Sequence, residues 1–411
     1  SLPAPVATEP VRPAHARAME GRYGAGPRAI DLIEVSDRLY LEPVRGGTRI
    51  ELRARGDTLI VDGRLGFGAR MLPLTGDGAS AGDVRALVIG DDTLRRVGIG
   101  KPEPAPARWD GLIGEYGWDH NTLYILEKDG RLHALIEWFF LYPLEEVSPD
   151  VFRFPASGLY DGETLVFERD ATDRALRVEA AEVVFERRSV GAEDGETFRI
   201  TPVRPVEELR QVALAATPPV ETGDFREPEL VEITTLDPTI ELDIRYAGTN
   251  NFMGAVFYAE PRAFLQRPAA EALVRAHRGL REHGYGLLIH DAYRPWYVTK
   301  MFWDATPAEQ KLFVANPADG SRHNRGAAVD LTLYELETGL PVEMVSGYDE
   351  FSPRAFPRYP GETGLQRWHR ELLRDAMEAE GFDVYEWEWW HFDYGEWRSY
   401  PILNLTFDEI P

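Results

Sequence analysis

Two histidines and an aspartate stand in positions that suit a metal ion. His323 comes directly before a predicted strand, Asp330 lies within that strand, and His391 lies in the last predicted strand. Two imidazoles and one carboxylate are the usual protein share of a catalytic zinc site, which leaves a fourth position for water. Zinc lowers the pKa of such a water and polarises a carbonyl group beside it. The sequence therefore predicts one zinc ion per chain and a hydrolytic reaction.

Hydrolysis of an amide also needs a group that takes a proton from water and passes it to the leaving amine. Glu388, three residues before His391, is the candidate, and Glu386 is the rival. Residues three apart in a regular strand point to opposite faces of the sheet. We therefore expect a bend or bulge near Trp389 and Trp390 that turns Glu388 and His391 to the same side.

Several other kinds of active site are excluded by the sequence. It contains no H-E-x-x-H helix motif, no G-x-S-x-G elbow and no phosphate-binding P-loop. The chain has no cysteine, which rules out disulfides, thiolate zinc sites and a cysteine nucleophile. The other histidines in the second half have no motif around them and are interpreted as structural; they are His277, His283, His290 and His369.

The elements that must position these residues alternate between helix and strand after residue 230. Apolar periodicity predicts helices at 268–282, 307–314 and 364–380, and strands at 285–289, 326–333 and 385–394. In the first of these helices one face carries Leu273, Val274, His277 and Leu280, and in the last the residues expected to point inward are Leu365, Trp368, Leu372, Ala376 and Met377. Helices mixed with such short strands indicate an α+β domain, in which helices cover one side of an antiparallel sheet.

The first half of the chain is typical of β structure and contains a weak internal repeat. The segment at 21–24 recurs at 114–117, an offset of 114 − 21 = 93 residues, and Arg38-Leu39 and Asp57 recur at the same offset. Short apolar–polar alternations are broken by turn residues such as Gly and Asp. We expect an all-β region of two repeated units, each a small barrel or curled sheet.

Composition shifts divide the chain into five expected segments. They are a flexible leader at 1–14, β-rich units at 15–105 and 106–210, a linker at 211–229 and the α+β domain at 230–411. The leader is rich in Pro and Ala, and it could be the start of a mature exported protein. We expect a periplasmic or secreted location, and a cytoplasmic one is left open.

The net charge of the chain limits the kinds of molecule that it is expected to bind. It has 411 residues, with 45 Lys and Arg against 69 Asp and Glu, a net charge of −24. An acidic chain of this kind lacks the basic surface that nucleic acids and anionic lipids require. No run approaches the ~20 apolar residues of a membrane span. Nucleic acids and membranes are therefore not expected partners.

Four segments together resemble a known family. They are Ser321-x-His323-x-x-Gly326-x-Ala328-x-Asp330, Glu388-Trp389-Trp390-His391, Asp291-Ala292-Tyr293-Arg294-Pro295 and the Tyr246 to Phe252 segment. Residues 230–411 resemble the VanX-type D-alanyl-D-alanine dipeptidases, zinc peptidases related to the D-Ala-D-Ala carboxypeptidases and the hedgehog fold. The first half of the chain has no counterpart in those enzymes.

The resemblance implies a role for each site residue. His323, Asp330 and His391 would bind zinc, and Glu388 would be the general base and acid. Arg294 would stabilise the oxyanion, as a fixed guanidinium can. The remaining positions would contact the substrate. Asp349 and Tyr246 would bind its ammonium group, Ser321 would touch its backbone, and Trp389 would wall the pocket.

The expected activity is zinc-dependent hydrolysis of D-alanyl-D-alanine or a related cell-wall dipeptide. One alternative is a carboxypeptidase or endopeptidase that acts on longer peptidoglycan peptides. Asp349 favours free dipeptides, because a blocked amine would leave its charge buried and unpaired. The second alternative is a binding protein whose β-repeats capture a cell-wall fragment.

Overall fold

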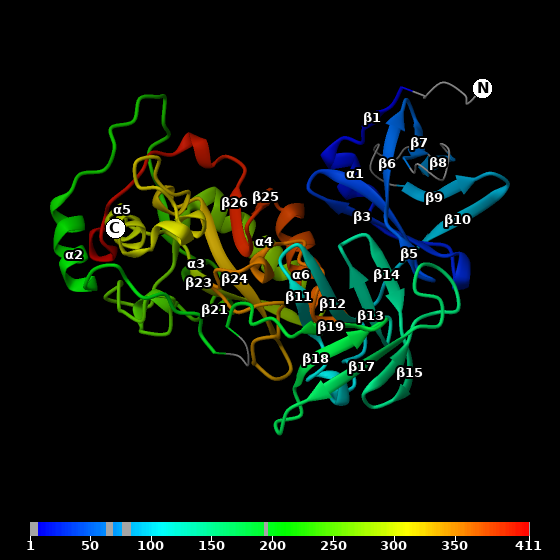
Figure 1. The fold of residues 1–411 in the computed structure, drawn as a ribbon. Helices are drawn as coiled ribbons and strands as arrows, with labels where there is room; N and C mark the ends of the chain where they lie inside the picture. The colour runs from blue at the N-terminus through cyan, green and yellow to red at the C-terminus, as the bar shows by residue number, and fades with distance from the viewer. Residues whose placement is uncertain (1–6, 63–68, 76–83, 193–195, 411) are drawn as a thin grey trace. The chain divides into compact units, whose positions relative to one another are not determined.

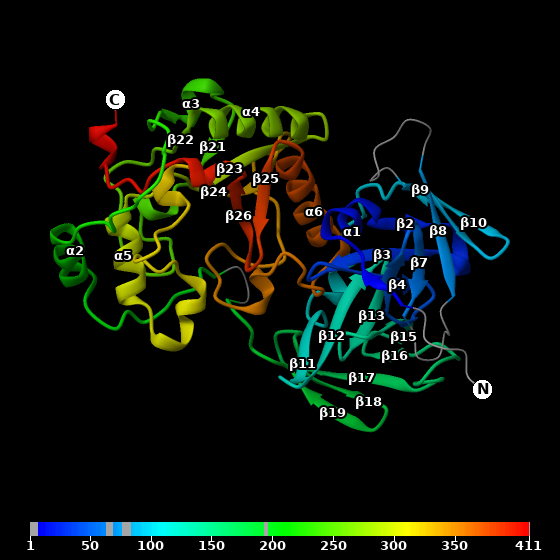
Figure 2. The ribbon, with the colours of Figure 1, turned by 90° about the horizontal axis from the view of Figure 1, so that it is seen from above.

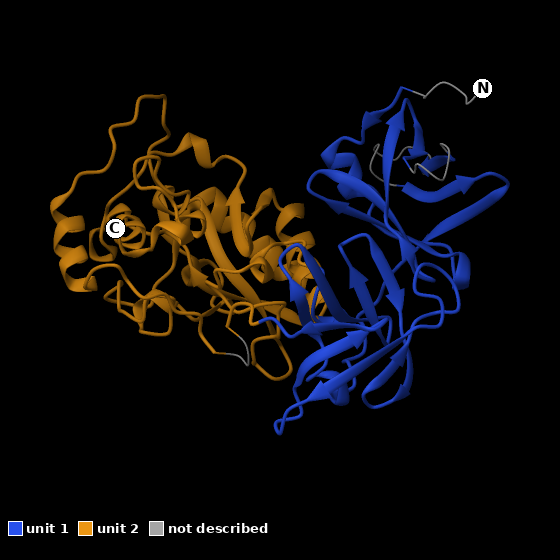
Figure 3. Ribbon diagram, in the orientation of Figure 1, with its two compact units in different colours: residues 1–188, 360–365 blue, residues 189–359, 366–411 orange. Residues whose placement is uncertain are grey.

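The structure is a computed structural model that describes residues 7–62, 69–75, 84–192 and 196–410. It divides into two compact units (Figure 3). Unit 1 comprises residues 1–188 and 360–365, and unit 2 comprises residues 189–359 and 366–411. No α-helix in the described part of the chain combines the length and the apolar character that a bilayer span requires.

Eight strands of unit 1 form a closed barrel (Figure 1). Around the ring they are β6 (Ile50–Arg55), β4 (Arg38–Pro43), β3 (Ile30–Val35), β2 (Gly21–Tyr23), β10 (Asp92–Val97), β9 (Val84–Ile89), β8 (Arg70–Thr75) and β7 (Thr58–Val61). The ring closes because β7 also pairs with β6. Alternate residues along these strands, such as Leu39 and Leu41, belong to one apolar core.

Two five-stranded sheets make up the rest of unit 1. The first contains β11 (Gly114–Trp118), β12 (Asn121–Lys128), β13 (Arg131–Ile136), β14 (Phe140–Pro143) and β5 (Gly47–Thr48). The second contains β15 (Glu145–Ser148), β16 (Val151–Arg153), β17 (Thr164–Arg169), β18 (Ala175–Ala180) and β19 (Val183–Glu186). Side chains from both sheets share one core. The all-β character predicted for this region is confirmed.

The residues of the sequence repeat adopt the same local structure in both places. Strands β4 and β13 start 131 − 38 = 93 residues apart and end 136 − 43 = 93 residues apart. The Tyr23 hydroxyl donates to the Met19 carbonyl at 2.8 Å, and the Tyr116 hydroxyl donates to the Leu112 carbonyl at 2.7 Å. Each tyrosine thus contacts the carbonyl oxygen four residues before it.

The ends of the predicted segments differ from the observed division. Residues 1–6 of the expected leader lie outside the described residues, but β1 (Glu9–Pro10) pairs with β6, and helix α1 (Pro13–Met19) follows. The division between the units falls after Arg188, so residues 211–229 belong to unit 2. Helix α2 (Val206–Ala215) also lies there.

Unit 2 is built on a five-stranded sheet, and its α+β character is confirmed. The strand order is β21 (Glu241–Leu242), β23 (Tyr285–Asp291), β24 (Ala328–Glu335), β26 (Glu388–Tyr394) and β25 (Phe382–Tyr385). Only the β21–β23 pair is parallel. A short ladder joins β20 (Leu230–Glu232) to β22 (Phe264–Gln266), and helix α3 (Ile233–Leu236) follows β20.

Three longer helices accompany the sheet (Figure 2). Helix α4 (Arg267–Arg281) buries the predicted face of Leu273, Val274, His277 and Leu280. Helix α5 (Trp296–Ala305) follows the Arg294 loop. Helix α6 (Gly364–Ala379) buries Met377 as predicted, but its other buried residues include His369 and Leu373, whereas the expected Leu365 and Trp368 are half-buried. Its buried face is therefore rotated by about one residue.

Candidate active site

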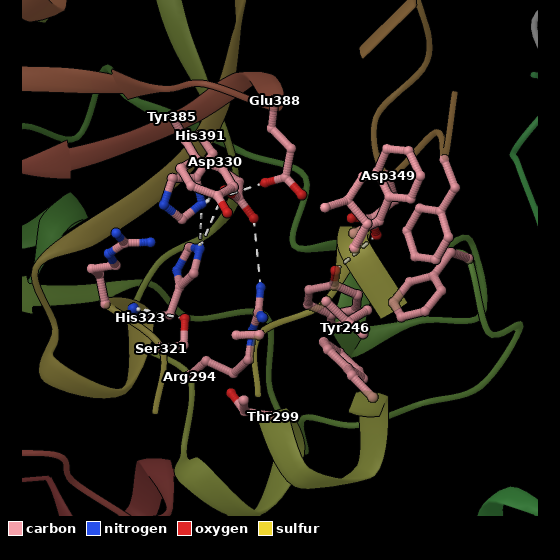
Figure 4. Close-up of a pocket in the computed structure, with 18 of the residues that line it drawn as sticks. Tyr246, Arg294, Thr299, Ser321, His323, Asp330, Asp349, Tyr385, Glu388 and His391 are labelled. Atoms are coloured by element: carbon pink, nitrogen blue, oxygen red, sulfur yellow. Dashed lines mark hydrogen bonds and ion pairs between the residues drawn. The ribbon is translucent and has the colours of Figure 1, made fainter. Parts of the chain in front are cut away.

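His323, Asp330 and His391 point their ligand atoms at one another (Figure 4). His323 Nε2 lies 3.2 Å from Asp330 Oδ1 and 3.1 Å from His391 Nδ1. His391 Nδ1 lies 3.0 Å from Asp330 Oδ1. Ligands about 2.0–2.1 Å from a tetrahedral zinc ion are about 3.3 Å apart. The spacing of the three atoms therefore fits one small divalent cation.

The hydrogen bonds around the cluster leave lone pairs at its centre. His323 Nδ1 lies 2.6 Å from the Ala292 carbonyl oxygen, which can only accept, so this nitrogen carries the proton. His391 Nε2 lies 2.9 Å from Asp393 Oδ1 and is fixed in the same way. Asp330 Oδ1 is buried without a hydrogen-bond donor among the described residues. Three lone-pair donors that face one another call for a cation.

The electrostatics of the cluster agree with this requirement. Burial alone would lower the pKa of His391, but the carboxylates of Asp393 and Asp330 raise it to about 10. Burial would raise the pKa of Asp330, yet the two imidazoles hold it well below its usual range. In the metal-free chain, a proton therefore occupies the position between the ligand atoms where a cation would bind.

Strand pairing and one turn explain how distant residues meet. Asp330 on β24 is the direct cross-strand partner of His391 on β26. His323 lies in a short 3₁₀ turn that ends at Gly326 in the left-handed conformation, with φ 63°. A Cβ atom at Gly326 would lie 2.4 Å from a Leu230 side-chain carbon, so a larger residue would have to displace Leu230 and also adopt a strained backbone conformation. This turn directs His323 back toward the start of β24.

The register of β25 and β26 shifts at Glu388. Tyr385 pairs with Glu388, whereas the preceding Val384 pairs with Phe392. This irregularity is the expected bulge, and it brings Glu388 Oε2 to 3.7 Å from His391 Nδ1. Burial raises the pKa of Glu388 to about 7. Glu386, the rival base, is exposed and does not line the described pocket.

Arg294 is held rigidly beside the cluster. Its Nε and Nη2 atoms each lie 2.8 Å from Asp291 Oδ2, and Tyr258 donates to the other oxygen of that carboxylate. Arg294 Nη2 lies 3.6 Å from Asp330 Oδ2. The guanidinium also lies over the ring of Phe302. Such fixed contacts leave a positive charge in a defined place next to the ligands.

Asp349 and two tyrosines form a second polar group in the same pocket. Tyr246 donates to Asp349 Oδ2 at 2.8 Å, and Tyr348 lies 3.3 Å from the Tyr246 hydroxyl. The Tyr348 hydroxyl also donates to Asp330 Oδ2 at 2.9 Å. Burial and the nearby Asp330 charge raise the pKa of Asp349 well above its usual range. Asp349 is therefore a buried carboxyl group with little positive charge around it, and a cationic group that enters the pocket can bind to it.

One pocket of unit 2 brings together eight of the nine residues predicted for the site. They are Tyr246, Arg294, Ser321, His323, Asp330, Asp349, Glu388 and His391. The ninth, Trp389, does not line the described pocket. Its indole N–H instead donates to Ser346 Oγ at 2.8 Å within the protein. The bulge that turns Glu388 and His391 inward directs the intervening Trp389 elsewhere.

Sequence reasoning missed three residues that the structure brings to the site. Asp393 binds the outer nitrogen of His391, Tyr348 binds Asp330, and Arg322 lines the pocket. Asp393 could have been found, because it lies two residues after His391 in a strand and so shares its face. Arg322 lies between two predicted site residues. Tyr348 had no pattern that indicated a role.

Comparison with known proteins places this site in a family. A family model described as D-ala-D-ala dipeptidase matches residues 226–408, which contain every residue of the pocket. The D-alanyl-D-alanine dipeptidase of Escherichia coli (strain K12) is 35% identical over 179 residues, which cover 44% of this chain and 91% of the relative.

Two further relatives carry the same name. A D-alanyl-D-alanine dipeptidase of Enterococcus faecium is 33% identical over 187 residues, which cover 41% of this chain and 91% of the relative. That of Streptomyces coelicolor is 32% identical over 189 residues, which cover 42% of this chain and 91% of the relative. With the buried His–Asp–His cluster, these matches show that the chain is a metallopeptidase that belongs to the D-Ala-D-Ala dipeptidase family of M15 peptidases.

Proposed function

We propose that this protein hydrolyses D-alanyl-D-alanine or a closely related cell-wall dipeptide, with one zinc ion and with Glu388 as the general base. The observation that carries the proposal is the geometry of the cluster. Three lone-pair donors converge within 3.2 Å, and the Glu388 carboxyl group lies 3.7 Å from one of them. The relatives named as dipeptidases support the same substrate class.

Different residues in and around the cluster carry out different parts of the reaction. His323, Asp330 and His391 would hold the zinc ion, which would lower the pKa of a water molecule and polarise the scissile carbonyl. Glu388 takes a proton from that water and delivers it to the leaving amine. Arg294, fixed by Asp291, donates hydrogen bonds to the oxygen on which negative charge develops.

Asp349 supports a free dipeptide as the substrate rather than a longer peptide. Its carboxyl group is buried and already accepts a hydrogen bond from Tyr246. A substrate ammonium group would form a charge-assisted hydrogen bond there. An acylated amine offers no positive charge, and so a longer peptide would bury that carboxyl group without a counterion.

Replacement of Glu388 by glutamine tests the general base. We expect E388Q to retain its metal, because the three ligands are unchanged, and to lose about 10²–10⁴-fold in kcat on D-alanyl-D-alanine. Metal content by elemental analysis and release of D-alanine are the two measurements.

Glu386→Gln is the matched control for this prediction. Glu386 lies two residues away, is exposed and carries the same charge. We expect E386Q to behave as the unaltered protein. Full activity in E388Q with its metal present would assign the base to another residue.

Blocking the substrate amine tests the role of Asp349. We expect the unaltered protein to prefer D-alanyl-D-alanine over its N-acetyl derivative, and D349N to lose about 10–100-fold in kcat/KM on the free dipeptide, which is the range for a hydrogen bond to a charged group. Rates on the two substrates measure the preference. Equal rates for the unaltered protein would argue for longer peptides.

A further inference from the structure

Two arginines line the pocket, and they differ in how their charge is used. Arg294 is engaged by Asp291 at 2.8 Å and lies near Asp330. Arg322 has a single ion pair among the described residues, from its Nε to Asp393 Oδ2 at 3.4 Å. Its side chain keeps 35% of its surface exposed. Its side chain also forms a hydrogen bond with Tyr385. Arg322 is therefore the less engaged of the two pocket arginines, and it keeps surface that an anionic ligand can reach.

The guanidinium of Arg322 is held in a fixed orientation. It lies over the ring of Tyr385 at 5.3 Å and over the ring of Trp397 at 5.1 Å. Asp393 binds its Nε from one side. The two Nη groups at the other end form a planar fork of N–H donors. Such a fork matches the two oxygens of a carboxylate and binds them side by side.

Arg322 lines the same pocket as Asp349. It stands between Ser321 and His323, and all three residues line the pocket. Figure 4 shows Ser321 and His323 on one side of Asp330 and Glu388, and Asp349 on the other. The pocket thus contains the guanidinium of Arg322 and the carboxyl group of Asp349 as well as the predicted metal ligands.

We propose that Arg322 binds the C-terminal carboxylate of the substrate, which rests on the dipeptidase function proposed above. A free dipeptide carries an ammonium group at one end and a carboxylate at the other, and its single amide bond lies between them. Asp349 and Arg322 match these two charges. After hydrolysis the C-terminal amino acid is the leaving group, and its carboxylate stays on Arg322 until it is released.

The test compares D-alanyl-D-alanine with D-alanyl-D-alaninamide, which lacks the terminal negative charge. We expect the unaltered protein to prefer the free acid by about 10–100-fold in kcat/KM, the range for a charge-assisted hydrogen bond. We expect R322Q to lose that preference mainly through a higher KM for the acid. Its kcat/KM on the amide should fall far less than its kcat/KM on the acid, and its metal content should match that of the unaltered protein. Arg322→Lys, which keeps the charge without the fork, should retain part of the preference.

Arg398→Gln is the matched control. Arg398 also lies over the ring of Trp397, at 4.1 Å, but it does not line the described pocket. We expect R398Q to keep the full preference for the acid.

The outcomes separate the two proposals. Equal rates on acid and amide in the unaltered protein would overturn the role of Arg322 and leave the dipeptidase function standing. A loss in R322Q that is equal for both substrates would mean a structural role and would also overturn it. Hydrolysis of neither substrate by the zinc-loaded protein would overturn the dipeptidase function, and the Arg322 proposal with it.

Discussion

At the scale of single residues, Asp393 is shared by two parts of the site. One carboxylate oxygen lies 2.9 Å from His391 Nε2, and the other lies 3.4 Å from Arg322 Nε. Its negative charge makes the imidazole a stronger donor and fixes which nitrogen faces the metal position. The same carboxylate orients the arginine that we assign to the substrate. Asp393 thus positions both residues without lining the described pocket.

Substitution of Asp393 by asparagine should weaken metal binding. Without the carboxylate charge, His391 loses basicity and its outer nitrogen loses a strong acceptor. We expect the zinc affinity of D393N to fall by about 10–100-fold. Competition with a chromophoric chelator measures this affinity without reference to activity.

Asp383→Asn is the control for that experiment. Asp383 lies opposite Asp393 on β25, is exposed, and loses the same charge on substitution. We expect D383N to keep the zinc affinity of the unaltered protein. An unchanged affinity in D393N would remove the positioning role of Asp393.

The sequence predicted the ligands better than the residues that support them. His323, Asp330, Glu388 and His391 follow from residue type and motif, and the structure brings them together. The family resemblance implies that Trp389 walls the pocket. The bulge that turns Glu388 and His391 inward instead leaves the Trp389 indole donating to Ser346, outside the lining of the described pocket.

At the scale of elements, helix α4 and strand β23 are joined by a buried histidine. Leu287 N–H of β23 donates to His277 Nδ1 at 3.1 Å, and His277 Nε2 lies 2.9 Å from Thr239 Oγ1. A nitrogen that accepts a backbone hydrogen bond cannot carry a proton. Burial, the largest cause, lowers the pKa of His277 to about 4. The folded chain therefore keeps this imidazole neutral.

The lowered pKa of His277 predicts that the folded chain loses stability in acid. The unfolded chain protonates His277 below pH about 6.5, whereas the folded chain does so only near pH 4. Its contribution is therefore complete above about pH 6.5 and is lost as the pH falls toward 4. We expect metal-free H277Q to lose less stability than the metal-free unaltered protein between pH 7 and pH 4.5, by on the order of 2 kcal/mol. Urea denaturation at both pH values measures the difference.

His283→Gln controls for removal of a histidine as such. His283 lies two residues after the end of α4 and is exposed. We expect H283Q to lose stability in acid as the unaltered protein does. The same pH dependence in H277Q and the unaltered protein would mean that His277 is not held neutral.

Sequence patterns located these elements but not all of their contacts. The buried face of α4 follows from its periodicity, with Leu273 and Leu280 inward as predicted. For α6 the buried set also includes Arg370, which donates to the Tyr359 carbonyl. A pattern of apolar residues cannot indicate a buried arginine, and so it placed that face about one residue away.

At the scale of the whole chain, the site lies entirely in unit 2. Every described residue that lines the pocket falls within 246–391 and outside 360–365. The Escherichia coli relative is matched over 91% of its length by 179 residues of this chain. Little of that relative is left to correspond to unit 1. The described residues that line the pocket therefore all come from unit 2.

A fragment of residues 189–411 tests this separation. We expect it to bind zinc and to hydrolyse D-alanyl-D-alanine with a kcat/KM close to that of the full chain, because it contains all the site residues. Steady-state rates on the free dipeptide are the measurement. A fragment that is folded and metal-loaded but inactive would assign part of the catalysis to unit 1.

A shorter fragment, residues 230–411, should be less stable than the longer one. It lacks Glu221, whose carboxylate pairs with Arg325 and accepts a hydrogen bond from Ile402 N–H at 2.7 Å. Arg325 is buried, so its charge would lose a partner. Thermal denaturation of the two fragments compares them, and equal melting temperatures would mean that residues 189–229 add nothing to stability.

The arrangement of unit 1 could be predicted only in part. Turn residues and alternation indicated short strands throughout. Closure of the first ring depends on the pairing of β6 with β7 and of β2 with β10. The second of these joins residues more than seventy positions apart, which no local pattern reveals.

The closed ring of unit 1 affects how the folded protein can aggregate at high concentration. A strand at the edge of an open sheet has unpaired backbone amide groups. A strand from a neighbouring molecule can pair with them, and repeated addition of strands builds a fibril. Each of the eight ring strands already has a partner on both sides. The barrel therefore gives another chain almost no template for such growth, and any aggregation of the folded protein would have to start from a different part of the molecule.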